Sequence, residues 1–253
     1  MHSSFWIAVL VGIASGSVGP FILLRRMALV GDALSHVALP GIALALLYGF
    51  DPFYGVIVFL ALASLVIYWL EGNSRVPPDT IVGLLFTASL AVGILIIPKG
   101  DIIDSLFGAF PELSLPFLLG ILTAAAVLSV LCFVLARRFL FRIVSPDLGE
   151  IHGVGRKYDL ALLLIFALIV ALGIKLVGTL LMGALTIIPA AVAKTVCHGM
   201  RSFVVVSAAL GGVIAVGGMW LADTFNLLPG PSIVLFGVAL FVLSLPFGMR
   251  RTQ

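Results

Sequence analysis

The sequence predicts an all-α membrane protein, a bundle of about nine transmembrane helices, on three observations. First, 62% of the 253 residues are hydrophobic and only 10% are charged, whereas a soluble domain carries about 25% charged residues. Second, apolar stretches of the roughly 20 residues needed to cross a bilayer follow one another along the whole chain. Third, the basic residues fall almost entirely on one side of the resulting topology. We expect residues 1–253 to form a single transmembrane domain.

Gly and Pro separate several of the apolar stretches, as at Asp51-Pro52 and Pro77-Pro78. The opening MHSSFWIAVLVG lacks the basic segment of a secretory signal, so the first stretch is expected to remain as a helix. Residues 98–114 are too polar to span, and we expect a short amphipathic or re-entrant turn at 102–110. The predicted spans, of which one could fall short of crossing to leave eight, are 5–24, 33–49, 52–70, 80–97, 115–135, 158–174, 176–196, 202–222 and 230–247.

The Lys and Arg residues indicate an orientation. With the N-terminus outside and the sides alternating, 12 of the 14 basic residues fall in the cytoplasm, and only Lys99 and Lys175 fall outside. The positive-inside rule expects such an asymmetry, so the C-terminus is predicted to be cytoplasmic. The net charge of +3 then reflects loop composition and does not indicate a nucleic-acid surface. The cytoplasmic set is Arg25, Arg26, Arg75, Arg137, Arg138, Arg142, Arg156, Lys157, Lys194, Arg201, Arg250 and Arg251.

The longest cytoplasmic loop, 137–157, contains the pattern of a short helix at about 145–155. Ser145 is a typical N-cap residue, and Pro146 suits the first helical position. Asp147 and Glu150 favour the first turns, where the helix dipole stabilises negative charge. Gly153 or Gly155 would end the helix, because glycine readily adopts the left-handed conformation found there.

The most informative polar residues in the apolar spans are Asp32 and His36. They are four residues apart, so on a helix they share one face, about 6 Å apart along the axis. Ionisable groups inside the hydrocarbon cost roughly 2.5–3.5 kcal/mol and persist where they face a cavity, a partner or an ion. A carboxylate and an imidazole suit a divalent metal such as zinc, manganese or iron. Pro40-Gly41 in the same helix would loosen it and could turn a backbone carbonyl toward a cavity.

Two simpler interpretations of this pair stay open. Asp32 could only cap its helix, since it stands near the expected helix start and follows Gly31. His36 could be a hydrogen-bonded packing residue. Two ligands also do not complete a tetrahedral or octahedral site, so water, backbone or another helix would have to supply the rest. At Pro189, in Thr186–Ala191, a kink flanked by small residues for close helix packing is the expected role.

Enzyme chemistry finds no support in the motifs. The chain lacks HExxH, GxSxG and the P-loop GxxxxGK[ST], so it is predicted not to hydrolyse nucleotide itself. Ser35 and His36 are adjacent, and neighbouring residues on a helix point about 100° apart, so they cannot form a nucleophile–base pair.

Several segments resemble, in order, the membrane permease subunits of ABC-type zinc and manganese importers. RRMALVGDALSHVALPGIALA at 25–45 is similar to a signature of that family. Further similar segments are SLFGAF at 105–110, SPDLGEIHGV at 145–154, VGTLLMGALTIIPAAVAK at 177–194 and PGPSIVLFGVALFVLS at 229–244. One departure is Ala109, where family members often carry an acidic residue.

The resemblance implies a homodimeric permease in the cytoplasmic membrane of a prokaryote. A separate cytoplasmic ATPase would power it, an extracytoplasmic protein would deliver the metal, and no permanent cofactor is expected. Asp32 and His36 would then be metal-pathway residues, with zinc favoured over manganese or iron. The helix carrying Ser145, Pro146, Asp147, Leu148, Glu150 and Gly153 would couple the permease to the ATPase. The alternative from a different class is an ion-driven secondary transporter that uses Asp32 and His36 as a proton relay.

Overall fold

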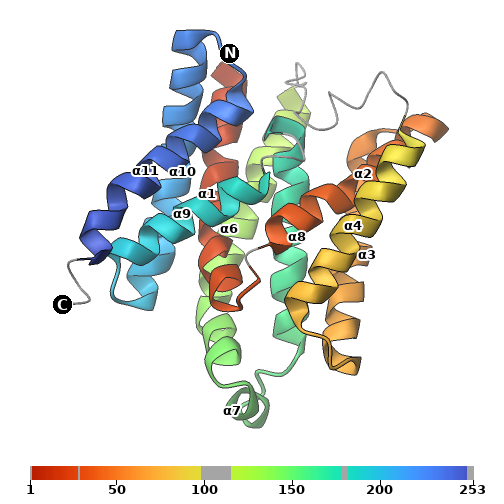
Figure 1. Cartoon of the computed structure of the whole chain (residues 1–253), viewed down its shortest axis with the longest axis vertical. Helices are drawn as coiled ribbons and strands as arrows, with labels where there is room; N and C mark the ends of the chain where they lie inside the picture. Colours follow the sequence, from red (N-terminus) through yellow and green to blue (C-terminus); the bar gives the residue numbers. More distant parts are fainter. Residues whose placement is uncertain (1, 28, 98–114, 178–181, 250–253) are drawn as a thin grey trace.

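The computed structural model describes residues 2–27, 29–97, 115–177 and 182–249, and every regular element among them is an α-helix. The described residues form nine long helices and one short one, arranged as the bundle shown in Figure 1. The all-α bundle is therefore confirmed. The helices are α1 His2–Leu24, α2 Val30–Tyr48, α3 Pro52–Asn73, α4 Pro78–Ile96, α6 Leu115–Val144, α7 Pro146–Ile151, α8 Lys157–Val177, α9 Met182–Val196, α10 Met200–Phe225 and α11 Pro229–Met249.

Eight of the described helices are long and apolar enough to cross a membrane. The ninth long helix, α9, has only 15 residues. The expected span 176–196 was wrong at its start, because α8 continues to Val177 and α9 begins at Met182. Lys175, the one charge near this boundary, lies inside α8, so it did not mark where one helix stops and the next begins. The turn expected at 102–110 lies outside the described residues.

The loop expected at 137–157 is mostly helix. The helix α6 runs to Val144, nine residues beyond the predicted end, because the arginines in this stretch are good helix formers. The short helix α7 spans only Pro146–Ile151, which corrects the expected 145–155. Its C-terminal end is a Schellman motif, with Gly153 at φ 74° and the Val154 N–H donating to the Gly149 carbonyl.

The centre of the bundle is α1, which packs closely on α10 through small residues. A Cβ atom added to Gly12 would meet the backbone of Gly211, and one added to Gly16 would meet the backbone of Ser207. In Figure 1 these two helices lie side by side. Small residues let membrane helices approach until their backbones touch, so this pair forms a close-packed core.

The helix α2 begins about midway down the bundle in Figure 1 and rises away from α1. Gly41 of α2 and Gly55 of α3 face each other so closely that neither could carry a Cβ atom without meeting the other's carbonyl. On another side, Gly93 of α4 lies against Leu39 and the Pro40 ring. These contacts hold α2 between α3 and α4 and thereby set where its polar face lies.

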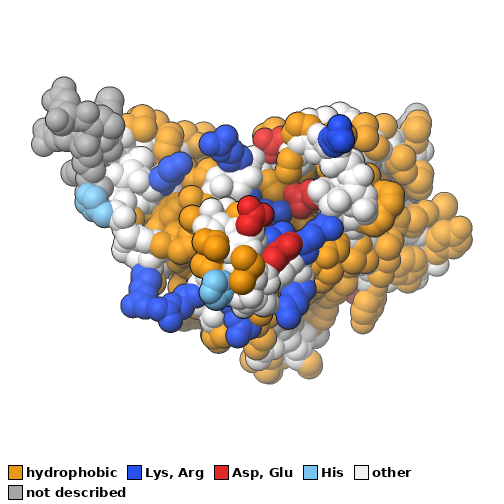
Figure 2. Space-filling model, turned by 90° about the horizontal axis from the view of Figure 1, so that it is seen from below, with side chains coloured by type: hydrophobic (Ala, Val, Ile, Leu, Met, Phe, Trp, Pro, Cys, Tyr) orange, Lys and Arg blue, Asp and Glu red, His pale blue; other side chains and the backbone are white. Residues whose placement is uncertain are grey.

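Polar and apolar surfaces are separated. Seen from the end that carries α7, the molecule gathers Lys, Arg, Asp, Glu and His side chains at this face, with hydrophobic side chains around them (Figure 2). Along the bundle, large apolar side chains such as Leu84 and Leu95 of α4 are exposed. A surface of this kind is matched by lipid along the flanks and by water at the α7 end.

Candidate metal-pathway site

Asp32 is the third residue of α2 and does not cap it. The helix begins at Val30, three residues earlier than expected, and its N-cap position is occupied by Leu29 without a side-chain cap bond. The capping interpretation of Asp32 was therefore wrong. The negative carboxylate is still well placed in the first turn, near the positive end of the helix dipole.

Asp32 and His36 face each other on one side of α2. The distance from His36 Nε2 to Asp32 Oδ1 is 3.9 Å, which is longer than a hydrogen bond. His36 is 5% exposed, whereas the Asp32 side chain is 46% exposed. Within the described part of the chain, the buried His36 Nδ1 has no hydrogen-bond partner. The interpretation of His36 as a hydrogen-bonded packing residue thus finds no partner among these residues.

Two further residues shape the surroundings of the pair. The Phe86 ring of α4 stands edge-on to the His36 ring, with centroids 5.0 Å apart. Gly183 of α9 lies against the backbone of Asp32, and a Cβ atom there would come within 2.7 Å of the Asp32 amide nitrogen. The starts of α2 and α9 therefore meet at the site. The Phe86 ring lies on one side of the Asp32–His36 pair, and the α9 backbone at Gly183 lies on another.

The proline of α2 adds a polar group to the same face. Pro40 has no N–H, so the carbonyl of His36, four residues earlier, lacks its usual helical donor. Ser35 is turned elsewhere and donates its hydroxyl proton to the Gly31 carbonyl at 2.7 Å. One carboxylate, one imidazole and one freed carbonyl thus come from two adjacent turns of α2.

Asp32 and His36 can supply only some of the ligands that a metal ion needs. With metal–ligand bonds of about 2.1 Å, a tetrahedral ion separates a nitrogen and an oxygen ligand by about 3.4 Å. The observed 3.9 Å needs only a small side-chain rotation to reach that value. No group of three His, Cys, Asp or Glu side chains in the described ranges could hold a metal ion. Further ligands would have to come from water, from backbone or from another chain.

The residues expected to couple to an ATPase lie on α7 or directly beside its ends, apart from this site. Ser145 occupies the N-cap position, but its side chain makes no cap bond, and Pro146 is the first helical residue. Asp147 and Leu148 are exposed, and Glu150 lies 3.5 Å from Arg142 of α6. The short helix therefore projects an exposed face from the end of the bundle.

Sequence reasoning did not single out Phe86 or Gly183 as parts of the site. Phe86 is one aromatic residue in an apolar helix, and no local pattern distinguishes it. Gly183 is one of many glycines in the apolar spans, and its packing against Asp32 depends on contacts between distant segments. Pro189 lies inside α9 and is buried.

The fold and the site define a polytopic membrane permease with a polar face in the middle of its helices. The sequence profile of the "ABC 3 transport family" matches residues 1–248. The chain belongs to this family, and it is the membrane subunit of an ABC transporter in which a separate ATPase subunit hydrolyses ATP.

Three relatives cover nearly the whole chain. The manganese import system permease protein ScaB of Streptococcus gordonii is 34% identical over 245 residues, 94% of this chain and 87% of its own length. The manganese transport system membrane protein MntC of Listeria monocytogenes is 32% identical, over 96% of this chain and 89% of its own. The high-affinity zinc uptake system membrane protein ZnuB of Haemophilus influenzae is 30% identical, over 94% and 93%.

Solved structures share the fold. The structure of PsaBC from Streptococcus pneumoniae in complex with Fab matches with a TM-score of 0.83 and 32% identity, over 96% of this chain and 90% of that one. An inward-facing putative metal-chelate type ABC transporter matches with a TM-score of 0.75 at 18% identity, which shows the fold alone.

Proposed function

We propose that this permease imports a divalent transition metal, zinc or manganese, and that Asp32 and His36 contact the ion as it passes. The observation that carries the proposal is the buried His36 imidazole, whose Nδ1 lacks a partner among the described residues while its Nε2 faces the Asp32 carboxylate. Leaving such groups unpaired inside a protein costs about 1–3 kcal/mol unless something else binds them. A passing metal ion would supply the missing interaction.

Zinc is the ion that the sequence favours, and it stays our prediction. The relatives include proteins named for manganese transport and proteins named for zinc uptake. Carboxylate and imidazole bind both ions, and affinity order alone does not decide selectivity. The metal is cargo in this proposal, and no resident cofactor is required.

The remaining ligands would come from a second copy of the chain. Each chain offers one carboxylate and one imidazole, and the Asp32 side chain is 46% exposed, so a partner can reach it. Two pairs facing each other across a homodimer would provide four ligands, the number that a tetrahedral ion takes. An extracytoplasmic binding protein would deliver the metal, and α7 would dock on the ATPase. We place the assembly in the cytoplasmic membrane of a bacterium.

Uptake of radioactive Zn²⁺ and Mn²⁺ tests the proposal in cells that co-express the ATPase and the binding protein. Asp32→Asn and His36→Ala should each lower uptake at least tenfold at normal membrane levels. Ser35→Ala is the matched control, because Ser35 lies between them in α2 but its hydroxyl bonds only the Gly31 carbonyl among the described residues; its uptake should stay within twofold. If the double variant Asp32→Ala plus His36→Ala still imports metal, the site assignment is wrong.

Two further experiments distinguish zinc from manganese and an ATP-driven importer from an ion-driven secondary transporter. Competition between the two metals, with the metal bound by the delivery protein measured in parallel, distinguishes zinc from manganese. An ionophore that collapses the ion gradients while ATP is maintained should leave uptake intact. Loss of uptake under that condition would favour the ion-driven secondary transporter.

A further inference from the structure

A chain of buried ion pairs connects α7 with the end of α1. Arg142 of α6 donates from Nε to Asp159 Oδ2 at 2.8 Å. Asp159 Oδ1 lies 3.7 Å from Arg25 Nη1, and Arg25 Nη2 donates to Glu71 Oε2 at 3.0 Å. The four side chains are only 11–14% exposed. Two arginines and two carboxylates therefore balance their charges inside the bundle, at the ends of four helices.

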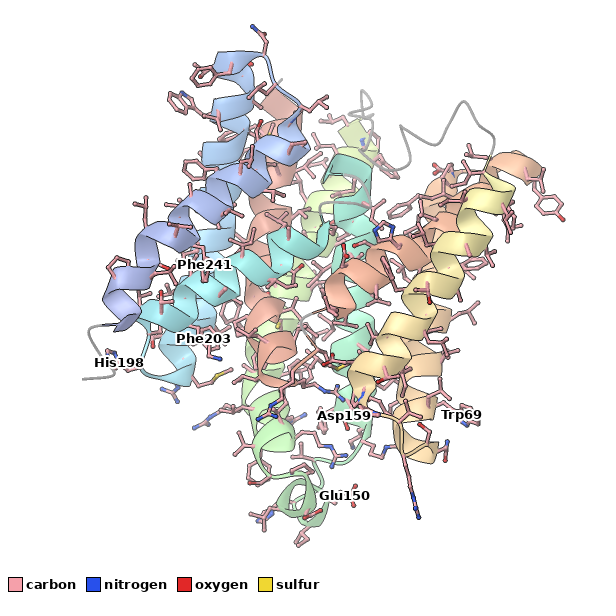
Figure 3. All side chains as sticks on the ribbon, in the orientation of Figure 1. Trp69, Glu150, Asp159, His198, Phe203 and Phe241 are labelled. Carbon is pink, nitrogen blue, oxygen red and sulfur yellow. The ribbon has the colours of Figure 1, made fainter. Side chains whose placement is uncertain are left out.

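At one end of this series of ion pairs, Arg142 contacts α7. Arg142 Nη1 donates to the Pro146 carbonyl in the first turn of α7 at 3.1 Å and lies 3.5 Å from Glu150 Oε1. In Figure 3, Glu150 is on the small α7 helix, and Asp159 lies above it, nearer the middle of the bundle. A displacement of α7 would therefore pull directly on the Arg142–Asp159 pair.

At the other end of the series, Arg25 is connected to the start of α2. The helix α1 closes with a Schellman motif in which Arg26 has φ 59° and the Met27 N–H donates to the Ile22 carbonyl. Met27 is fully buried, and its carbonyl accepts from the Val30 N–H, the first residue of α2. Arg25 is thus joined to α2 by a short segment with its own hydrogen bonds. Asp32 follows two residues after Val30.

The start of α8 and the end of α3 are joined by a separate set of contacts, which Arg156 makes. Arg156 donates to the Tyr68 carbonyl at 2.9 Å, and its guanidinium lies over the Tyr68 ring. The same guanidinium occupies the space that a Cβ atom on Gly72 would need. Glu71 of α3 and Asp159 of α8 are therefore held in a fixed position relative to each other. Arg25, which follows the end of α1, lies between their two carboxylates.

The contact in the middle of the series, between Arg25 and Asp159, is longer than the other two. At 3.7 Å the Arg25–Asp159 pair exceeds hydrogen-bond distance, whereas both outer pairs are hydrogen-bonded. Arg25 Nη1 and Glu71 Oε1 are also buried without a hydrogen-bond partner in the described part of the chain. A shift of less than an ångström would let Arg25 Nη1 bond Asp159. Buried ion pairs add little net stability, because the cost of removing the charges from water offsets their attraction.

We propose that Asp159 and Arg25 are positioning residues that transmit movement of α7 to the α1–α2 connection, so that ATP-driven motion reaches Asp32 and His36. This inference rests on the proposed metal import. It adds a specific route between the ATPase-facing helix and the metal-contacting helix: Arg142, Asp159, Arg25 and then α2.

The test measures metal uptake per ATP hydrolysed, with the permease, ATPase and binding protein reconstituted in vesicles and Zn²⁺ or Mn²⁺ supplied. Asp159→Asn should lower this ratio at least fivefold while ATP hydrolysis by the complex continues. Asp159→Glu, which keeps the charge, should recover most of it. Asp79→Asn is the control, because Asp79 is exposed at the start of α4 and forms no ion pair with the described residues. A variant that merely folds poorly lowers uptake and hydrolysis together and leaves the ratio unchanged.

An unchanged ratio in Asp159→Asn at wild-type levels would overturn the inference. If Asp159→Asn does not assemble, Arg25→Lys decides, because the compact ammonium keeps the charge but lacks the rigid planar fork with which the guanidinium spans the two carboxylates; a ratio within 1.5-fold of wild type in that variant would also overturn it. Failure of the wild-type complex to move either metal would instead refute the proposed function, and this inference with it.

Discussion

The Ser207 hydroxyl of α10 donates a hydrogen bond of 2.6 Å to the backbone carbonyl of Gly16 in α1. In a regular helix this carbonyl would accept from the N–H of residue 20, but residue 20 is proline and has none. The hydroxyl of a neighbouring helix thus satisfies the group that Pro20 leaves free. The two helices are in backbone contact at this point, so the bond lies in a closely packed part of the core.

Ser207→Ala should therefore destabilise the protein by about 1 kcal/mol, the usual net value of one buried hydrogen bond, with more if the carbonyl stays unpaired. Ser15→Ala is the matched control. Ser15 is equally buried in α1, but its hydroxyl has no partner among the described residues, so its removal should be neutral or stabilising. Thermal unfolding of the detergent-solubilised proteins measures both. Equal losses in the two variants would contradict the assigned role of Ser207.

This contact also marks the limit of what the sequence could predict. The all-α fold follows from apolar length, and the relation of Asp32 to His36 follows from their spacing, because both depend on local chain geometry. The partner of the Gly16 carbonyl is 191 residues away in sequence. No single-sequence pattern identifies such a pair. For the same reason Gly183 and Phe86 entered the site only through the structure.

Helix ends were the other limit. The start of α9 was misplaced, and α6 proved nine residues longer than expected. Hydropathy reports which segments prefer lipid, and it does not report where a helix that extends into water stops. Arg142 shows why: it is charged and still helical, because Asp159 and the Pro146 carbonyl satisfy it.

The close approach of Gly41 and Gly55 predicts intolerance to even one methyl group. Gly41→Ala would press a Cβ atom into the Gly55 carbonyl, and overpacking of this kind costs roughly 1–3 kcal/mol. Gly83→Ala in α4 is the comparison, since a Cβ atom there meets nothing within 4 Å; the better helix propensity of alanine should make it neutral or slightly stabilising. The ratio of monodisperse to aggregated protein after heating separates the two. An unaffected Gly41→Ala protein would refute the packing argument.

The contact of Gly183 with the Asp32 backbone predicts a defect in function that exceeds any defect in stability. A Cβ atom at 183 would lie 2.7 Å from the Asp32 amide nitrogen, and backbone cannot move aside as a flexible side chain can. Gly183→Ala should therefore displace the start of α2 and lower metal uptake at least fivefold at equal membrane level. Gly120→Ala in α6 has open space around it and should import normally. Normal uptake in Gly183→Ala would show that the position of Asp32 does not depend on α9.

The left-handed backbone of Gly153 predicts a graded series at the end of α7. At φ 74° an alanine is strained by roughly 1–2 kcal/mol, whereas asparagine adopts this conformation more readily. Gly153→Ala should shift the last turn of α7 and weaken co-purification of the ATPase with the permease, and Gly153→Asn should restore much of it. Gly155→Ala is the control, because Gly155 has no positive φ and open space for a methyl group. If Ala and Asn at 153 behave alike, backbone conformation is not what α7 requires there, and the loss would have to come from the added side chain itself.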